Sequence, residues 1–325
     1  MSISENVHIL FPSASPAPLQ IGLVNIMPDA AFLETERQFS GLVEGAAGRR
    51  PSRIHLFTLP EVVREGAAAI HAGTHYRSVE QLWPTRLDGL IVTGAEPRQP
   101  DLSQESYWPS LTRVIDWAED NTASTIFSCL AAHAAVQHLD GVRKQRRPTK
   151  LTGVFDCERV ANHWSTDDIG TPIKTPHSRW GHVTETDLAA KGYQVLTRSE
   201  ATGANLFAKS FGSQFLFLQG HPEYAGDALQ KEYRRDVRRF LTGERDVYPS
   251  LPLNVFRPAT EAKLELLALR AKQTRDPGLL TEVSRLAKTR SGPSDWAPGA
   301  TQLYANWLRY LLEQRRDLSR PVTQA

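Results

Sequence analysis

The chain has 325 residues, of which 40% are hydrophobic and 23% charged, an ordinary globular composition with enough apolar residues for a sizeable core. A net charge of +2 gives no reason to expect a nucleic acid or an anionic membrane as a partner. Apolar runs are all shorter than the roughly 20 residues that cross a bilayer. The two cysteines, Cys129 and Cys157, form neither a disulfide framework nor a zinc site, so we expect a cytoplasmic protein whose thiols stay reduced.

Apolar runs alternate with helical patterns along the first 245 residues. Residues 1–18, rich in Pro, Ser and Ala near their end, predict a flexible leader without the features of a signal peptide. Strands are predicted at 21–26, within 53–60, and at 90–92, 125–127 and 215–218. Helices are predicted from about Ala31, over 107–121, over the alanine-rich stretch that stops at Gly141, and up to about Gly243. Strands separated by helices indicate an α/β fold, with a mostly parallel sheet sandwiched by helices.

The character of the chain changes after residue 245. An extended, proline-bearing stretch is followed by a charged helical segment at 259–294 and by a final amphipathic helix carrying Leu303, Trp307, Leu308, Tyr310 and Leu311. We therefore divide the chain into a leader (1–18), a catalytic domain (19–245) and a helical C-terminal extension (246–325) that packs on the catalytic domain.

Four predicted strands end in loops with reactive or turn-forming residues. These loops are Asn25–Pro28, Thr93–Glu96, Ser128–Cys129 and Gly220–Glu223. Parallel strands bring their carboxyl ends to one edge of a sheet, where α/β proteins place their ligand sites. The sequence therefore predicts one site built from these four loops.

Cys129 is a candidate nucleophile because it stands where a strand turns into a helix. The partial positive charge at a helix N-terminus favours a thiolate. The position resembles a nucleophile elbow, although the usual flanking glycines are absent. The alternative interpretation is a buried structural cysteine. His221 and Glu223 strengthen the first interpretation, since a thiol needs a base and the base needs an orienting carboxylate; a solvated Gly-Pro turn is the alternative for these two.

Other polar residues are less specific. His133, His138 and His163 are interpreted as surface or packing residues. Arg234 and Arg235 belong to a basic run that is typical of a solvated helix face, unless one of them clamps a carboxylate. Residues 175–182, TPHSRWGH, lack strand or helix periodicity and predict a loop.

Several motifs occur together in the order found in one enzyme family. They are IGLVNIMP, ETERQF, LDGLIVTGA, YWP, STIFSCLAAHAA, KLTGVF, PHSR and GHPEY, followed by YANWLRYLL. With these motifs the chain resembles homoserine O-acyltransferases of the succinyltransferase type, whose fold is similar to that of class I glutamine amidotransferases. The resemblance spans about residues 19–245 and resumes near the C-terminus.

The resemblance implies a ping-pong acyl transfer from acyl-CoA to the hydroxyl of homoserine. Cys129 would carry the acyl group as a thioester, and His221, oriented by Glu223, would act as base and acid. Lys150, Ser178 and Arg179 match positions that line the family's active site, and Arg235, rather than Arg234, matches the arginine for the α-carboxylate. We expect the backbone N–H groups of Ala95 and Leu130 to bind the oxyanion. Acyl-CoA is a co-substrate, no metal or other cofactor is implied, and a homodimer is expected by resemblance.

Departures from the family pattern leave substrate choices open. Arg98 falls where a small residue or a glutamate separates succinyl from acetyl donors, so it is a candidate for acyl specificity. Acetyl-CoA as donor and another hydroxy amino acid as acceptor remain alternatives, and the segment 259–294 has no counterpart. Two readings of other classes are a glutamine amidotransferase-like hydrolase and a non-catalytic binding protein.

Overall fold

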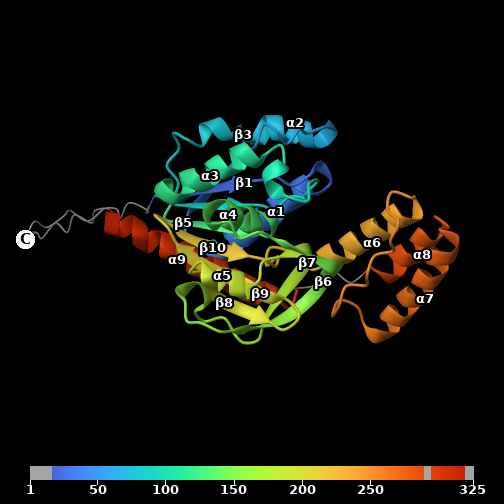
Figure 1. Cartoon of the computed structure of the whole chain (residues 1–325). Helices are drawn as coiled ribbons and strands as arrows, with labels where there is room; N and C mark the ends of the chain where they lie inside the picture. Colours follow the sequence, from blue (N-terminus) through green and yellow to red (C-terminus); the bar gives the residue numbers. More distant parts are fainter. Residues whose placement is uncertain (1–16, 289–293, 319–325) are drawn as a thin grey trace, which may run out of the picture.

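A ten-stranded sheet runs through the centre of the computed structural model, which describes residues 17–288 and 294–318 (Figure 1). The strand order is β3-β2-β1-β4-β5-β10-β9-β8-β6-β7, and the six strands from β3 to β10 are parallel to one another. The other four pair antiparallel. The strands are β1 (Leu19–Val24), β2 (Ser52–Thr58), β3 (Arg77–Ser78), β4 (Gly89–Val92), β5 (Ser124–Ser128), β6 (Gln145–Arg159), β7 (Ile173–His182), β8 (Gln194–Ser199), β9 (Gly203–Ser210) and β10 (Gln214–Leu218).

Helices cover both faces of the parallel half. The α-helices of the described residues are α1 (Asp29–Ala47), α2 (Gly66–His75), α3 (Trp108–Asn121), α4 (Leu130–Asp140), α5 (Glu185–Ala190), α6 (Ala228–Leu241), α7 (Pro258–Thr274), α8 (Leu279–Leu286) and α9 (Ala297–Leu318). Alternate residues of each buried strand point to opposite faces, as the two-residue period of a strand requires. Phe127 of β5 packs with α3 and α4, whereas its neighbour Ile126 packs with α1 and α9. The predicted α/β fold, a mostly parallel sheet between two helical layers, is confirmed.

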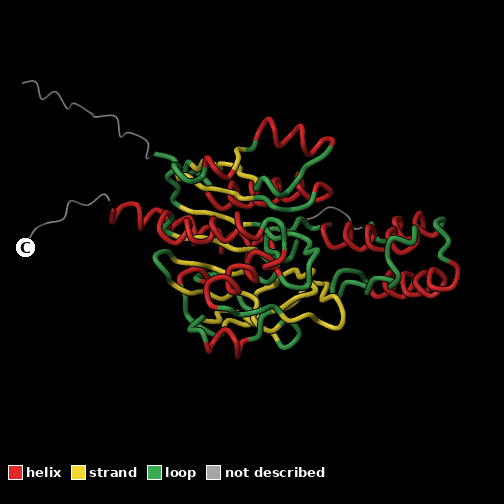
Figure 2. The backbone as a smooth tube through the Cα atoms, turned by 45° about the horizontal axis from the view of Figure 1, so that its top comes forward, coloured by secondary structure: helices red, strands yellow, loops and turns green. Residues whose placement is uncertain are grey.

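The residues after 245 separate into two groups. Helices α7 and α8 bury Leu264, Leu267 and Val283 against Tyr233 and Val237 of α6. These three helices lie beside the sheet in both views rather than over it (Figures 1 and 2). Helix α9 instead returns to the sheet and packs beside α1. The predicted helices of this region exist, and the division at residue 246 into a separate extension stays a prediction.

Helix α9 is an integral part of the sheet's cover. Its Trp307 and Leu311 are fully buried and lie directly on the backbone of Gly89, where an added Cβ would come within 2.6 Å of the indole and 2.7 Å of the leucine side chain. Leu303 and Leu308 are buried on the same face, and Tyr310 is half-buried. The predicted docking of the final amphipathic helix is therefore confirmed.

One predicted loop is a strand. Residues 175–182 belong to β7, which pairs antiparallel with β6 in the register His177 with Gly153 and Arg179 with Leu151. The stretch lacks the two-residue apolar period because its buried positions include the polar side chains of Thr175, His177 and Arg179. Residues 1–16 of the predicted leader lie outside the described residues. Within the described part of the chain, no helix is both long and apolar enough to cross a membrane.

Candidate active site

Cys129 occupies a sharp turn between β5 and α4. Its backbone has φ 52° and ψ −107°, a region that residues with a side chain rarely adopt. The turn is held at both ends, because Cys129 N donates to Leu218 O of β10 at 2.7 Å and His133 N donates to Cys129 O at 3.3 Å. A strained residue fixed in this way projects its side chain out of the sheet edge. The thiol stands at the N-terminus of α4 and is half-buried, whereas Cys157 is fully buried in β6.

His221 and Glu223 lie beside this thiol. His221 Nδ1 is 2.8 Å from Glu223 Oε1, and Ser128 Oγ donates to the same carboxylate oxygen at 3.4 Å. Burial alone lowers the pKa of His221, but the charges of Cys129 and Glu223 and a hydrogen bond with each outweigh it and raise that pKa well above its ordinary value. Two residues 92 positions apart in the chain are thus electrostatically coupled, as the meeting of β5 and β10 at one sheet edge predicts.

The imidazole of His221 is also fixed by stacking. The ring of Tyr224 lies over it at 4.3 Å with an interplanar angle of 17°. Tyr224 in turn donates from its hydroxyl to Glu232 Oε1 at 2.5 Å and accepts from Trp296 Nε1 at its backbone oxygen. This chain of contacts links the Cys-His-Glu group to a carboxylate on α6.

The loop after β4 lies against the same turn, where Leu130 and Ala95 are the predicted oxyanion donors. Gly94 lies so close to the turn that an added Cβ would be 3.1 Å from Leu130 N and 3.3 Å from Ser128 O. Leu130 N is at the first turn of α4, where it has no intrahelical acceptor, and Ala95 follows Gly94. Neither N–H donates a hydrogen bond to any residue that the structure describes. The arrangement suits an oxyanion between the two amides.

A cleft of about 390 Å³ opens above Cys129, within the range of small-molecule sites. It joins the carboxyl ends of the parallel strands to the β6–β7 pair and to α6. Eight of the predicted site residues line it: Ala95, Cys129, Leu130, Lys150, Ser178, Arg179, His221 and Arg235. Glu223 lies behind His221, buried to 7% exposure.

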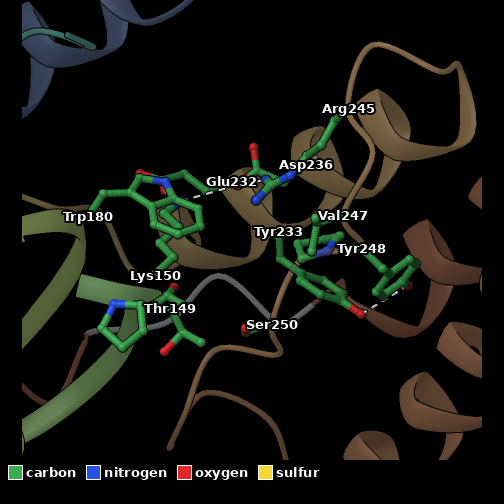
Figure 3. Close-up of a pocket in the computed structure, with 13 residues that line it drawn as sticks. Thr149, Lys150, Trp180, Glu232, Tyr233, Asp236, Arg245, Val247, Tyr248 and Ser250 are labelled. Carbon is green, nitrogen blue, oxygen red and sulfur yellow. Dashed lines mark hydrogen bonds and ion pairs between the residues drawn. The ribbon is translucent and has the colours of Figure 1, made fainter. Parts of the chain in front are cut away.

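A cluster of charged side chains forms the wall of the cleft towards α6. Figure 3 shows three of them, Lys150, Glu232 and Asp236, which also line a smaller neighbouring cavity. Lys150 Nζ is 3.1 Å from both Glu232 Oε2 and Asp236 Oδ2, and Arg235 pairs with Asp236 at 2.9 Å. Ser178 also donates to Glu232. Burial would raise the pKa of Glu232, but the charges of Lys150 and Arg235 and these hydrogen bonds lower it to about 2. Glu232 therefore presents a permanent anion, one helical turn from the cation of Arg235.

Arg179 is a buried cation in the cleft wall. Only 3% of the residue is exposed, and its guanidinium donates to His177 Nδ1 at 3.2 Å and to the carbonyl oxygens of Gly181 and Thr202 at 2.6 Å. Burial lowers its pKa to about 10, while the charge of Cys129 opposes this shift. Among the described residues no carboxylate pairs with Arg179, and its hydrogen-bond acceptors are all neutral.

Arg98 is the predicted site residue that the structure does not bring to the cleft. It is exposed and is not among the lining residues, although Ala95, Glu96 and Pro97 are. The loop turns away after Pro97 because the buried carboxylate of Glu105 accepts the N–H groups of Arg98 and Gln99 at 2.6 and 2.7 Å. The structure thus does not bring Arg98 to the cleft, and its role in acyl specificity stays a prediction.

Sequence reasoning missed several residues of the cleft. Glu232 and Asp236 were passed over within a basic run, although their spacing with Arg235 puts all three on one helix face. His133, interpreted as a surface or packing residue, is buried in the cleft wall; its Nε2 is 2.9 Å from Gln219 Oε1, and burial lowers its pKa to about 3. Within the described residues no cluster of three or more His, Cys, Asp or Glu could hold a metal ion.

The family model and the curated relatives agree on one family. A family model described as homoserine O-succinyltransferase matches residues 12–318. The homoserine O-succinyltransferase of Bradyrhizobium japonicum is 45% identical over 301 residues, covering 92% of this chain and 91% of that protein. That of Rhodopseudomonas palustris is 45% identical over 296 residues, covering 91% and 89%. Among solved structures, a glutamine amidotransferase from Thermotoga maritima is similar with a TM-score of 0.47 and 10% identity, covering 91% of this chain and 99% of that one.

Proposed function

This chain belongs to the homoserine O-succinyltransferase family and is an acyltransferase, and on that premise we propose that it transfers a succinyl group from succinyl-CoA to the hydroxyl of L-homoserine, in methionine biosynthesis. The observation that carries the mechanism is the coupling of Cys129, His221 and Glu223 at the floor of one cleft. The names of the relatives favour succinyl over acetyl as the acyl group and acyl transfer over glutamine hydrolysis.

The first half-reaction forms an acyl-enzyme. The Cys129 thiolate attacks the thioester carbonyl, and the N–H groups of Ala95 and Leu130 stabilise the oxyanion of the tetrahedral intermediate. The imidazolium of His221 gives its proton to the departing sulfur, so CoA leaves as the thiol and the succinyl group stays on Cys129 as a thioester.

The second half-reaction consumes homoserine. Neutral His221 takes the proton of the homoserine hydroxyl as its oxygen attacks the acyl carbon, and the Cys129 thiolate leaves. The product is O-succinyl-homoserine, and the enzyme returns to its thiolate–imidazolium form. Glu223 stabilises the imidazolium in both steps without itself changing protonation.

Three charged groups match the charges of the two substrates. Glu232 and Arg235 would hold the ammonium and the carboxylate of the zwitterionic amino acid. The Nε and Nη2 atoms of Arg235 bond Asp236 Oδ1, which leaves Nη1 for a substrate carboxylate. Arg179, buried near Cys129 without a carboxylate partner, would receive the distal carboxylate of the succinyl group, the role once assigned to Arg98. Lys150 and Ser178 would hold Glu232 in place.

Mass spectrometry of the protein after exposure to succinyl-CoA, without homoserine, tests this proposal. We expect one succinyl group on the peptide that contains Cys129, its loss when homoserine is added, and no labelling of a Cys129→Ala variant that unfolds at the same urea concentration. Cys157→Ala is the matched control and retains the label. Succinyl on another residue, or ammonia release from glutamine at a comparable rate, would contradict it. A cytoplasmic location and a homodimer remain expectations from cysteine usage and from resemblance.

A further inference from the structure

The rim of the cleft formed by β6 and β7 carries positive charge that the protein does not neutralise. Arg146 lines this rim, is exposed and, among the described residues, forms no ion pair. Its guanidinium lies over the ring of Trp180, 4.8 Å from the centroid. The opposite rim differs, because Arg239 there pairs with Glu96 at 3.5 Å. The unpaired positive charge at the mouth of the cleft that could attract an anionic ligand therefore lies on the β6–β7 side.

The strand pairing fixes the position of Arg146. Arg146 pairs with Gly181 of β7, and a register shift separates this pair from the next, Leu151 with Arg179. Trp180 is half-buried between the cleft and the smaller cavity of about 80 Å³ drawn in Figure 3. The guanidinium of Arg245, which follows α6 in the chain, lies 5.8 Å from the centroid of the same ring. The indole is thus a platform that holds guanidinium groups at the mouth.

Lys144 adds a second cation to this rim. It lines the cleft, and its Nζ donates to the backbone oxygen of Pro100 at 3.1 Å. Burial and the charge of Arg146 lower the pKa of Lys144, whereas the charges of Asp101 and Glu105 oppose that shift. Lys144 and Arg146 repel each other at the mouth of the cleft, and a multiply charged anion bound between them would offset this repulsion.

We propose that Arg146 and Lys144 bind the phosphate groups of CoA, with Trp180 holding the Arg146 guanidinium in place. The inference rests on the proposed function for the identity of the donor. A cleft of about 390 Å³ has room for an acyl group, the adjoining part of the pantetheine arm and the amino acid, so the nucleotide end of the donor lies at the mouth. The guanidinium fork of an arginine without an ion-pair partner matches the geometry of a phosphate, which it binds through bidentate charge-assisted hydrogen bonds.

The test compares two donors in the wild type and in Arg146→Gln. Succinyl-CoA carries the phosphates, whereas S-succinyl-pantetheine keeps the thioester and lacks them. We expect Arg146→Gln to raise the KM for succinyl-CoA about tenfold, the effect of losing one charge-assisted contact. The KM for succinyl-pantetheine stays within twofold of the wild-type value, which also shows that the variant is folded. Arg146→Lys should restore part of the affinity for succinyl-CoA. Added salt should raise the KM for succinyl-CoA more in the wild type than in Arg146→Gln.

Two further comparisons make the outcome decisive. Arg198→Gln removes an exposed cation of β8, paired with Glu185 away from the cleft, and leaves both KM values unchanged. Donors based on dephospho-CoA show whether the effect belongs to the 3′-phosphate or to the diphosphate, and either result supports the site. An equal penalty with succinyl-CoA and succinyl-pantetheine, or none with either, overturns it.

The site can also be measured without any acyl transfer. Calorimetric titration of CoA into Cys129→Ala gives a Kd that rises about tenfold in Cys129→Ala/Arg146→Gln, whereas pantetheine binds both proteins alike. If wild-type protein moves no acyl group from either donor, the proposed function fails; if transfer proceeds and the two donors respond alike to Arg146→Gln, this inference fails alone.

Discussion

Replacement of Gly94 by alanine should impair acyl transfer without unfolding the protein. A methyl group at this position would lie 3.1 Å from Leu130 N and 3.4 Å from Leu130 Cβ. These distances are tighter than ordinary van der Waals contact, so the first residue of α4 must shift by a few tenths of an ångström. The shift moves the Leu130 N–H, one of the two proposed oxyanion donors, away from the developing charge.

The size of the effect follows from what such a donor contributes. Complete loss of one oxyanion donor lowers kcat by about 10²- to 10³-fold, or about 2.7 to 4 kcal/mol. A displaced donor loses less than a deleted one, so we expect kcat to fall by about 10- to 100-fold, which is about 1.4 to 2.7 kcal/mol in the activation barrier. The KM for homoserine should change little, because Gly94 is not one of the charged groups proposed to hold the amino acid.

The assay follows release of free CoA with a thiol reagent, in single-turnover and steady-state mode. Gly45→Ala, in α1 with open space around the added methyl, is the matched control and should leave kcat unchanged. Urea unfolding of both variants separates a local shift from a loss of fold. A kcat for Gly94→Ala within twofold of the wild type, in a protein of normal stability, would refute the placement of the oxyanion at Leu130 N.

Three further predictions concern charge and packing. The pKa of His221 is raised on folding, so its protonated form stabilises the native state below about pH 6.5, and that contribution is lost as the pH rises through the raised pKa. Glu223→Gln removes one of the charges that raise this pKa, so the difference in unfolding free energy between the variant and the wild type, measured with urea, should become smaller as the pH rises. A difference that does not depend on pH would contradict the coupling. Arg235→Gln should raise the KM for homoserine at least tenfold and change the KM for succinyl-CoA little. Arg234→Gln, at a residue that does not line the cleft, should change neither KM. If the two variants raise the KM for homoserine equally, the α-carboxylate of homoserine binds elsewhere. Trp307→Ala should cost about 3 to 5 kcal/mol of unfolding free energy, against less than about 0.5 for Leu266→Ala on the exposed side of α7; a loss below 1 kcal/mol would mean that α9 docks only loosely.

The parallel half of the sheet was predictable because its strands are short apolar runs buried on both faces. Large apolar residues such as Ile126 and Phe127 predict a buried strand, and the loops after these strands carry Cys129 and His221. The antiparallel half was not predictable in the same way. Strand β7 buries His177 and Arg179, whose hydrogen bonds and charge are satisfied only by tertiary partners, so its sequence has no apolar period to read.

The candidate site divides along the same line. A nucleophile, a base and a carboxylate can be found from the order of strand ends, since topology brings these ends together. The charged wall of the cleft depends on distances between β6 and α6 that no local pattern encodes, which is why Glu232 looked like one acid in a basic run. The position of Arg98 outside the cleft was not predictable either, because it depends on the hydrogen bond by which Glu105 directs the backbone of the loop.

The seating of α9 on Gly89 has a consequence for how the protein is made. Strand β4, which this helix covers at Gly89, emerges from the ribosome roughly two hundred residues before α9 does, so this apolar face of the nascent sheet stays exposed until synthesis is nearly finished. A chain that ended before α9 would leave this apolar surface exposed to solvent and would be a substrate for chaperones and proteases, even though every residue of the Cys-His-Glu group had already been translated.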